Sequence, residues 1–151
     1  MQIIPADLDD PHIQALLMHH RATARAAVAI CSAHALDIDA LRAADIAVFA
    51  GWERNVLLVI GALRALAGGN GEIKSMHTAL AARGRGAGAA MGAHLIAAAR
   101  AHGMQRVSLE TGSTDFFAPA RRLYRRLGFT ECAAFGGYAA DDNSVFMTLA
   151  L

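Results

Sequence analysis

The sequence predicts a single α/β domain, residues 1–151, with a mixed, mostly antiparallel central sheet of about seven strands and helices on both faces. Three observations predict this class. The chain has the length of one domain and contains no linker, repeat or low-complexity tract. Strand-like runs follow one another between residues 45 and 78, as in an antiparallel meander. A glycine-rich loop, a helix and a further strand come next, which completes one β–loop–helix–β unit.

The N-terminal part begins with a short strand at Ile3-Ile4, and a helix is predicted over residues 11–30. Two aspartates followed by Pro11 are typical of a helix start, because proline fits the first turn. Apolar residues then recur at helical spacing. Residues 32–41 are less regular, and we expect a second short helix within them.

The rest of the chain alternates between apolar runs and residues typical of turns. The meander is predicted as strands over residues 45–50, 56–67 and 72–78, with turns at 51–55 and 68–71. The later elements are a helix over 88–102 that Gly103 ends, a strand over 107–111, a helix from a cap at 113–115 to Leu127 that Gly128 ends, and strands over 134–138 and 144–149.

Composition excludes several classes of function. Lysine and arginine number 14 against 13 acidic residues, so a net charge of +1 gives no basic face for nucleic acid. No apolar run reaches the roughly 18 residues of a membrane span, and no signal peptide is recognisable. Two cysteines, Cys31 and Cys132, are too few for a disulfide framework and are expected to be inert thiols. The low cysteine count favours a reducing environment, so we expect a cytoplasmic protein. We expect no metal site, because no Cys/His ligand spacing occurs.

The most informative segment is the glycine-rich loop that precedes the predicted helix over residues 88–102. Glycines allow a tight turn and a close backbone approach, and a helix N-terminus directs free N–H groups at a bound anion. Arginines add formal positive charge. A diphosphate-bearing cofactor is therefore predicted at this loop, whose residues are Arg83, Gly84, Arg85, Gly86, Ala87 and Gly88.

Two other kinds of phosphate-binding loop are compatible with a glycine-rich segment before a helix. A nucleoside-triphosphate loop needs a lysine after its glycines, and none follows here. A dinucleotide loop of the form G-x-G-x-x-A fits Gly84, Gly86 and Ala89, with Glu110 at the end of the next strand. That interpretation is weaker, because the loop follows an antiparallel meander and too little chain remains for a second half-domain.

A third interpretation fits more of the chain. Arg83-x-x-Gly86-x-Gly88 matches the [QR]-x-x-G-x-[GA] signature, and residues 120–129 resemble the late element A-x-x-L-Y-x-x-x-G-F. On these motifs the chain resembles the GNAT superfamily of N-acetyltransferases over residues 45–151, within a small bacterial subgroup. The resemblance implies a splayed pair of strands that receives acetyl-CoA as co-substrate. It implies that the pantetheine arm and the pyrophosphate are bound by Met76, His77, Thr78, Arg83, Gly84, Arg85, Gly86, Ala87, Gly88 and Ala89.

The resemblance also implies two catalytic residues. Glu72 lies eleven positions before Arg83, the offset of the general base in histone-type members, and partial burial is expected to raise its pKa. His77 and Glu110 are the alternatives for this role. Tyr124, four residues before the glycine of the G-F pair, is expected to protonate the departing thiolate.

One departure from the family pattern concerns the start of the helix that carries Tyr124. Many members have an asparagine there that contacts CoA, and here Ser113, Thr114 or water is expected to replace it. Four arginines follow on the same helix. They are interpreted either as solvated surface or as ligands of the 3′-phosphate of the cofactor: Arg121, Arg122, Arg125 and Arg126.

The function predicted on this basis is acetyl-CoA-dependent transfer of an acetyl group to an amine, of a small molecule or of a protein. The alternative is a non-catalytic acetyl-CoA-binding regulatory module. The acceptor site is expected between residues 32–45 and 136–143, where Asp37 and Asp39 either attract a cationic amine or belong to surface turns. A homodimer is compatible with the resemblance.

Overall fold

The computed structural model describes residues 1–27 and 37–151. Several predictions concern residues 28–36 and lie outside the described residues. These are the end of the first helix, Cys31, and the first part of both the second helix and the acceptor segment.

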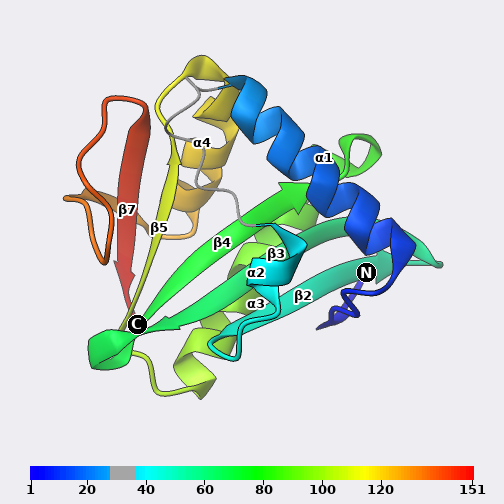
Figure 1. Ribbon diagram of the computed structural model, residues 1–151, viewed down its shortest axis with the longest axis horizontal. Helices are drawn as coiled ribbons and strands as arrows, with labels where there is room; N and C mark the ends of the chain where they lie inside the picture. The colour runs from blue at the N-terminus through cyan, green and yellow to red at the C-terminus, as the bar shows by residue number, and fades with distance from the viewer. Residues whose placement is uncertain (28–36) are drawn as a thin grey trace.

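A seven-stranded sheet forms the centre of the molecule, with the strand order β1-β2-β3-β4-β5-β7-β6 (Figure 1). Every neighbouring pair is antiparallel except β4 and β5, which run parallel. The predicted mixed sheet is therefore confirmed. The strands are β1 (Gln2–Pro5), β2 (Ile46–Glu53), β3 (Val56–Leu66), β4 (Asn70–Thr78), β5 (Arg106–Gly112), β6 (Thr130–Cys132) and β7 (Ser144–Ala150).

Helices cover both faces of the sheet. The described helices are α1 (Pro11–Ala27), α2 (Ile38–Leu41), α3 (Ala87–Ala101) and α4 (Ala118–Arg126), with short 3-10 turns at Ala67–Gly69, Leu80–Ala82 and Asp115–Phe117. In the view of Figure 1, α1 crosses in front of the sheet and α3 lies behind it. Each face has its own core: Ile13 and Leu17 of α1 pack with Ile60 of β3, whereas Met91 and Leu95 of α3 pack with Ile73 and other buried residues on the opposite face.

The predicted C-terminal ends of α3 and α4 are confirmed, whereas α4 begins at Ala118, after the 3-10 turn, and not at a cap within 113–115. Gly103 and Gly128 have φ angles of 70° and 97°, which suit glycine just after a helix. A Cβ at Gly92 of α3 would lie 2.4 Å from Leu127, which follows α4, so glycine allows the two helices to approach closely. The position of α4 against α3 therefore depends on this small residue.

The parallel strands β4 and β5 pair over only part of their length. Their register runs from Asn70 opposite Arg106 to Ile73 opposite Leu109, and β4 continues to Thr78 without further pairing to β5. The pairing of β4 with β3 shifts after Lys74, and Ser75 has a φ of 51°, which marks a β-bulge. The two strands diverge beyond this point (Figure 1). The expected splayed pair is therefore present.

Two details of the predicted strands are wrong. Residues 134–138 form a loop, and β6 lies earlier, at Thr130–Cys132. Gly136, with a φ of 57°, turns the chain there, and Phe135 and Tyr138 pack on Phe146 of β7 instead of extending as a strand. The turn predicted at 51–55 is shorter, because Gly51 lies at a bulge inside β2.

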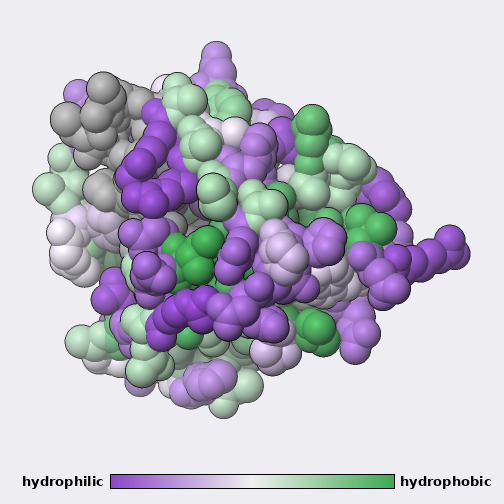
Figure 2. All heavy atoms as spheres, turned by 45° about the vertical axis from the view of Figure 1, so that its right-hand side comes forward, coloured by the Kyte–Doolittle hydropathy of each residue, from purple (hydrophilic) through white to green (hydrophobic). Residues whose placement is uncertain are grey.

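Within the described residues, no helix combines the length and apolar character needed to cross a membrane. On the face drawn in Figure 2, the apolar side chains of the described residues form separate small areas among polar ones.

Candidate active site

A cleft of about 720 Å³ opens where β4 and β5 diverge. Its walls come from the end of β4, the glycine-rich loop, the start of α3, one side of α4 and the second half of α1. Tyr124, His77 and His20 line it together with Ala82, Phe116, Phe117 and three arginines, among others. Elements far apart in the sequence thus line one space beside the splayed strands.

The glycine-rich loop forms an open cradle at one side of this cleft. Gly84 and Gly86 have φ angles of 74° and 85°, and no atom lies within 4 Å of where a Cβ would stand on either. Helix α3 begins directly afterwards at Ala87, so the backbone N–H groups of its first turn have no partner within the helix. Such a combination of exposed N–H groups and a helix dipole is suited to a phosphate anion.

All predicted cofactor-binding residues except Arg85 line the cleft: Met76, His77, Thr78, Arg83, Gly84, Gly86, Ala87, Gly88 and Ala89. Arg85 instead donates a hydrogen bond to Glu53 at 3.2 Å. The side chain of Arg83 lies against the end of β4, where its Nε donates to the Thr78 carbonyl at 3.4 Å. The structure thus brings together nearly the whole predicted set, and its role in binding stays a prediction.

A pair of histidines stands where α1 meets β4. The Nδ1 atoms of His20 and His77 are 3.2 Å apart, and the ring of His19 lies 5.5 Å from that of His77. Burial lowers the pKa of both His20 and His77 to about 4, so both are neutral at pH 7. No group of three or more His, Cys, Asp or Glu among the described residues is placed to hold a metal ion.

Tyr124 reaches the cleft from α4. Its ring is buried and packs edge-on against Phe129, with centroids 5.7 Å apart. Burial raises the pKa of the phenol far above its ordinary value, and the negative charge of Glu110 raises it further. The hydroxyl therefore keeps its proton at neutral pH and can act as a donor.

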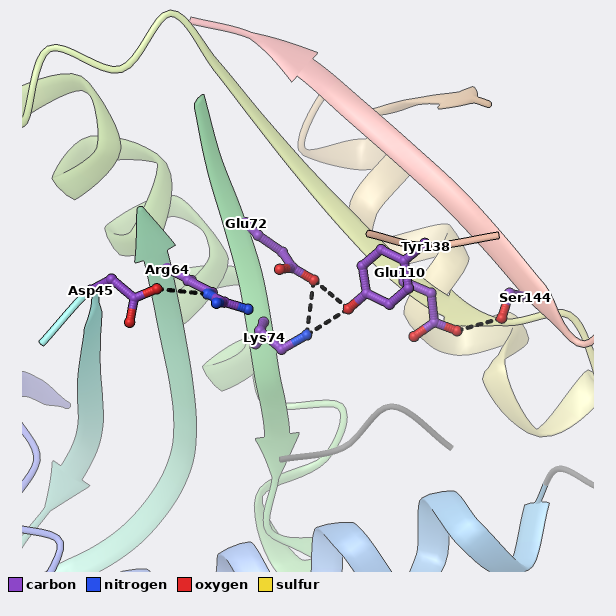
Figure 3. Close-up of polar contacts among 7 residues, drawn as sticks. All are labelled: Asp45, Arg64, Glu72, Lys74, Glu110, Tyr138 and Ser144. Atoms are coloured by element: carbon purple, nitrogen blue, oxygen red, sulfur yellow. Dashed lines mark hydrogen bonds and ion pairs between the residues drawn. The ribbon is translucent and has the colours of Figure 1, made fainter. Parts of the chain in front are cut away.

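Glu72 lies in a buried polar cluster and is not among the residues lining the cleft. Only 2% of its surface is exposed. Lys74 Nζ donates to Glu72 Oε1 at 2.9 Å, and the Tyr138 hydroxyl donates to the same oxygen at 2.6 Å (Figure 3). Lys74 Nζ also lies 2.6 Å from the Tyr138 oxygen, which closes a triangle of hydrogen bonds. Burial first, and then the hydrogen bond to Glu72, raise the pKa of Tyr138 well above its usual value.

Glu110 of β5 lies beside this cluster (Figure 3), and its Oε1 accepts a hydrogen bond from Ser144 Oγ at 2.7 Å. Its charge acts on both Tyr124 and Tyr138, so it links the cleft electrostatically to the polar cluster. The sequence pattern did not indicate Lys74 or Tyr138. The one available signal was that Lys74 stands two residues after Glu72, and therefore on the same face of the strand.

Comparison with known proteins agrees with this geometry. Residues 14–129 match the acetyltransferase (GNAT) family. The chain belongs to the GNAT family.

Two relatives extend this assignment. The chain is 44% identical over 117 residues to the Bacillus subtilis (strain 168) protein named uncharacterized N-acetyltransferase YsnE. The aligned region covers 78% of each chain. It is 36% identical over 145 residues to the Escherichia coli (strain K12) protein named uncharacterized N-acetyltransferase YedL. Here the aligned region covers 96% of this chain and 91% of that one. This GNAT protein is accordingly an acetyl-CoA-dependent N-acetyltransferase.

A solved structure supports the fold. A Bacillus subtilis acetyltransferase in complex with CoA superposes with a TM-score of 0.76 at 16% identity, over 99% of this chain and 98% of that one. At this identity the likeness concerns the fold alone.

The GNAT protein departs from the family pattern at the start of α4. Ser113 and Thr114 do not line the cleft, and the Ser113 hydroxyl donates to the Asp142 carbonyl at 2.7 Å. Phe116 and Phe117 line it instead. A Cβ at Gly112 would lie 2.0 Å from the Phe117 ring, so that ring lies directly over the end of β5. An apolar wall therefore stands where a polar contact was expected.

Proposed function

We propose that this N-acetyltransferase transfers the acetyl group directly from acetyl-CoA to an amine that approaches through the opening between β4 and β5. The observation that carries the proposal is the continuity of one cleft from the glycine-rich loop to Tyr124, beside strands that have stopped pairing. A cofactor whose pyrophosphate lies on the loop would run its pantetheine arm along the end of β4. Its thioester would then reach the bulge at Ser75.

The end of β4 is suited to hold the arm by its backbone. Beyond Ile73 this strand has no pairing to β5, and residues 76–78 line the cleft. An extended amide chain such as pantetheine can add to such an edge as a further strand would. Binding in this way depends on backbone groups and needs no particular side chain, which agrees with the apolar wall of Phe116 and Phe117.

Tyr124 serves as the general acid in this proposal. As the amine nitrogen attacks the carbonyl carbon, the carbon–sulfur bond breaks and the sulfur takes a proton from the phenol. A buried phenol with a strongly raised pKa remains protonated until a thiolate forms nearby. The proton that the amine loses returns to the phenolate by way of the general base and solvent.

Glu72 is the proposed general base. The Lys74 ammonium pairs with its carboxylate at 2.9 Å, and the Tyr138 hydroxyl donates to the same oxygen and orients it. His77 is the second candidate for this role, because it lines the cleft as a neutral imidazole whereas Glu72 does not line it. Tyr138 comes from the 136–143 segment, which supports the expectation that this loop shapes the acceptor side.

The acceptor is an amine of a small molecule or of a protein. The side chain of Asp37 accepts a hydrogen bond from the Ala40 N–H at 2.9 Å, so Asp37 caps α2 and is suited to a structural role. This favours the interpretation of Asp37 as a turn residue over that of an amine ligand.

The test is a thiol-release assay with acetyl-CoA and a panel of amines that includes polyamines, amino acids, aminoglycosides and lysine peptides. We expect release of CoA with at least one class of amine. Glu72→Gln and His77→Gln then separate the two candidate bases, because only loss of the base removes the acidic limb of the pH profile of kcat, where protonation of the base lowers the rate. Acetyl-CoA binding without turnover of any amine would contradict the proposal and favour a regulatory module.

A further inference from the structure

Helix α4 uses its four arginines in two different ways. Arg121 donates from Nη1 to the carbonyls of Gly112 and Thr114 at 2.6 and 2.9 Å, which holds the helix start against β5. Arg125 forms an ion pair with Glu131 of β6. Both of these arginines are engaged in contacts that connect α4 to neighbouring segments.

Arg122 and Arg126 differ from that pair. They stand four residues apart, and therefore one above the other on one side of the helix, and both line the cleft. Both are exposed, and neither forms a hydrogen bond or an ion pair with another described residue. Arg83 lines the same cleft, and none of its described lining residues is acidic. This wall of the cleft is therefore positively charged without internal compensation.

The position of these arginines relative to the glycine-rich loop follows from packing. A Cβ built on Gly88, in the first turn of α3, would lie 3.3 Å from Leu123 of α4. Leu123 is adjacent in sequence to Arg122, so α4 passes directly beside the place proposed for the pyrophosphate. An arginine side chain on that stretch of helix reaches phosphate groups bound near the loop but beyond its backbone.

We propose that Arg122 and Arg126 bind the 3′-phosphate of the CoA nucleotide, an inference that rests on the proposed function. The 3′-phosphate is a phosphomonoester whose ribose is joined to the pyrophosphate, and it carries up to two negative charges. The planar guanidinium offers two parallel N–H donors to such a group, which a backbone cradle cannot supply. The cleft would then distinguish CoA from dephospho-CoA, which lacks only this phosphate.

The experiment measures by calorimetry the affinities of the intact protein for CoA and for dephospho-CoA. We expect the wild-type protein to bind CoA at least about tenfold more tightly, the size of effect that one or two charge-assisted hydrogen bonds produce. The R122Q/R126Q double variant should bind CoA as weakly as it binds dephospho-CoA. Its affinity for dephospho-CoA should equal that of the wild type.

The matched control is R125Q, which removes the same charge from the same helix outside the cleft and should keep the preference for CoA. Equal binding of both ligands by the wild type, or equal weakening of both in the double variant, overturns the inference while leaving the proposed function intact. Binding of neither ligand by the folded wild-type protein would overturn the proposed function itself. Because each variant is judged by a ratio of two affinities, partial loss of folded protein does not imitate the expected result.

Discussion

Acidification should destabilise this protein through the His20–His77 pair. The two imidazoles share one contact, Nδ1 to Nδ1 at 3.2 Å, which requires one ring to donate and the other to accept. Protonation of both rings removes the acceptor and places two cations together beside His19, while Arg83 adds its charge on the side of His77. The native state therefore favours the neutral rings.

The magnitude follows from the pKa values. The pKa of His20 falls from 6.5 in the unfolded chain to about 4 in the native state, mainly through burial. Between these values the unfolded chain binds more protons, so the free energy of unfolding falls as the pH falls. Linkage gives a loss of about 2 kcal/mol at pH 5 for His20, rising to about 3.4 kcal/mol well below pH 4. Nothing is lost above about pH 7, where the ring is neutral in both states. The pKa of His77 is likewise lowered to about 4, so His77 contributes in the same direction.

Urea unfolding followed by circular dichroism at pH 7.5 and at pH 5 measures this loss. The wild type should lose about 2 kcal/mol more than His20→Gln over this interval, because glutamine does not titrate. His12→Gln is the matched control, since His12 lies on the same helix with its side chain 72% exposed. If His20→Gln and the wild type showed the same change in free energy between the two pH values, the reasoning from burial would be refuted.

Three further predictions concern the cleft and the polar cluster. Tyr124→Phe should lower kcat about a hundredfold or more and leave the KM for acetyl-CoA nearly unchanged. An unchanged rate of thiol release would contradict the role of Tyr124 as general acid. Gly88→Asp should abolish CoA binding in calorimetry, because its Cβ would lie 3.1 Å from Thr78 Oγ1 and its carboxylate would repel phosphate. A folded Gly88→Asp variant with normal affinity for CoA would contradict this prediction. In the polar cluster, Lys74→Met should lower the free energy of unfolding by about 3–5 kcal/mol, because it leaves the carboxylate of Glu72 buried without its cation. The double variant Lys74→Met/Glu72→Gln should recover part of the lost free energy of unfolding in urea titrations. A loss below about 1 kcal/mol in Lys74→Met alone would show that the Lys74–Glu72 ion pair is not needed for stability.

Features that depend on local backbone chemistry were predictable from the sequence. The glycine-rich loop, the ends of α3 and α4, and the hairpin between β3 and β4 all depend on glycines at positive φ, which leave a direct mark on the sequence. The cofactor side of the site belongs to this group. Its predicted residues lie in two short runs that are close together in the sequence, 76–78 at the end of β4 and 83–89 in the loop and the start of α3.

Features that depend on distant contacts were not predictable in the same way. Tyr138 meets Glu72 across 66 positions of sequence, and it does so from a loop that the pattern predicted as a strand. Phe117 occupies a wall of the cleft because Gly112 leaves room for its ring, a relation between two elements. Neither contact leaves a periodic or compositional mark on its own segment.

The four arginines of α4 show which features of the site depend on tertiary structure. By composition, Arg121, Arg122, Arg125 and Arg126 are equivalent cations on one helix. The helical repeat and the packing of Leu123 against α3 turn two of them toward the cleft, and the carbonyl of Gly112 and the carboxylate of Glu131 hold the other two. The amino-acid sequence specifies which charges the helix carries. Only the folded chain decided where each charge acts, because that depends on which neighbours the rotation of the helix brings within hydrogen-bond distance.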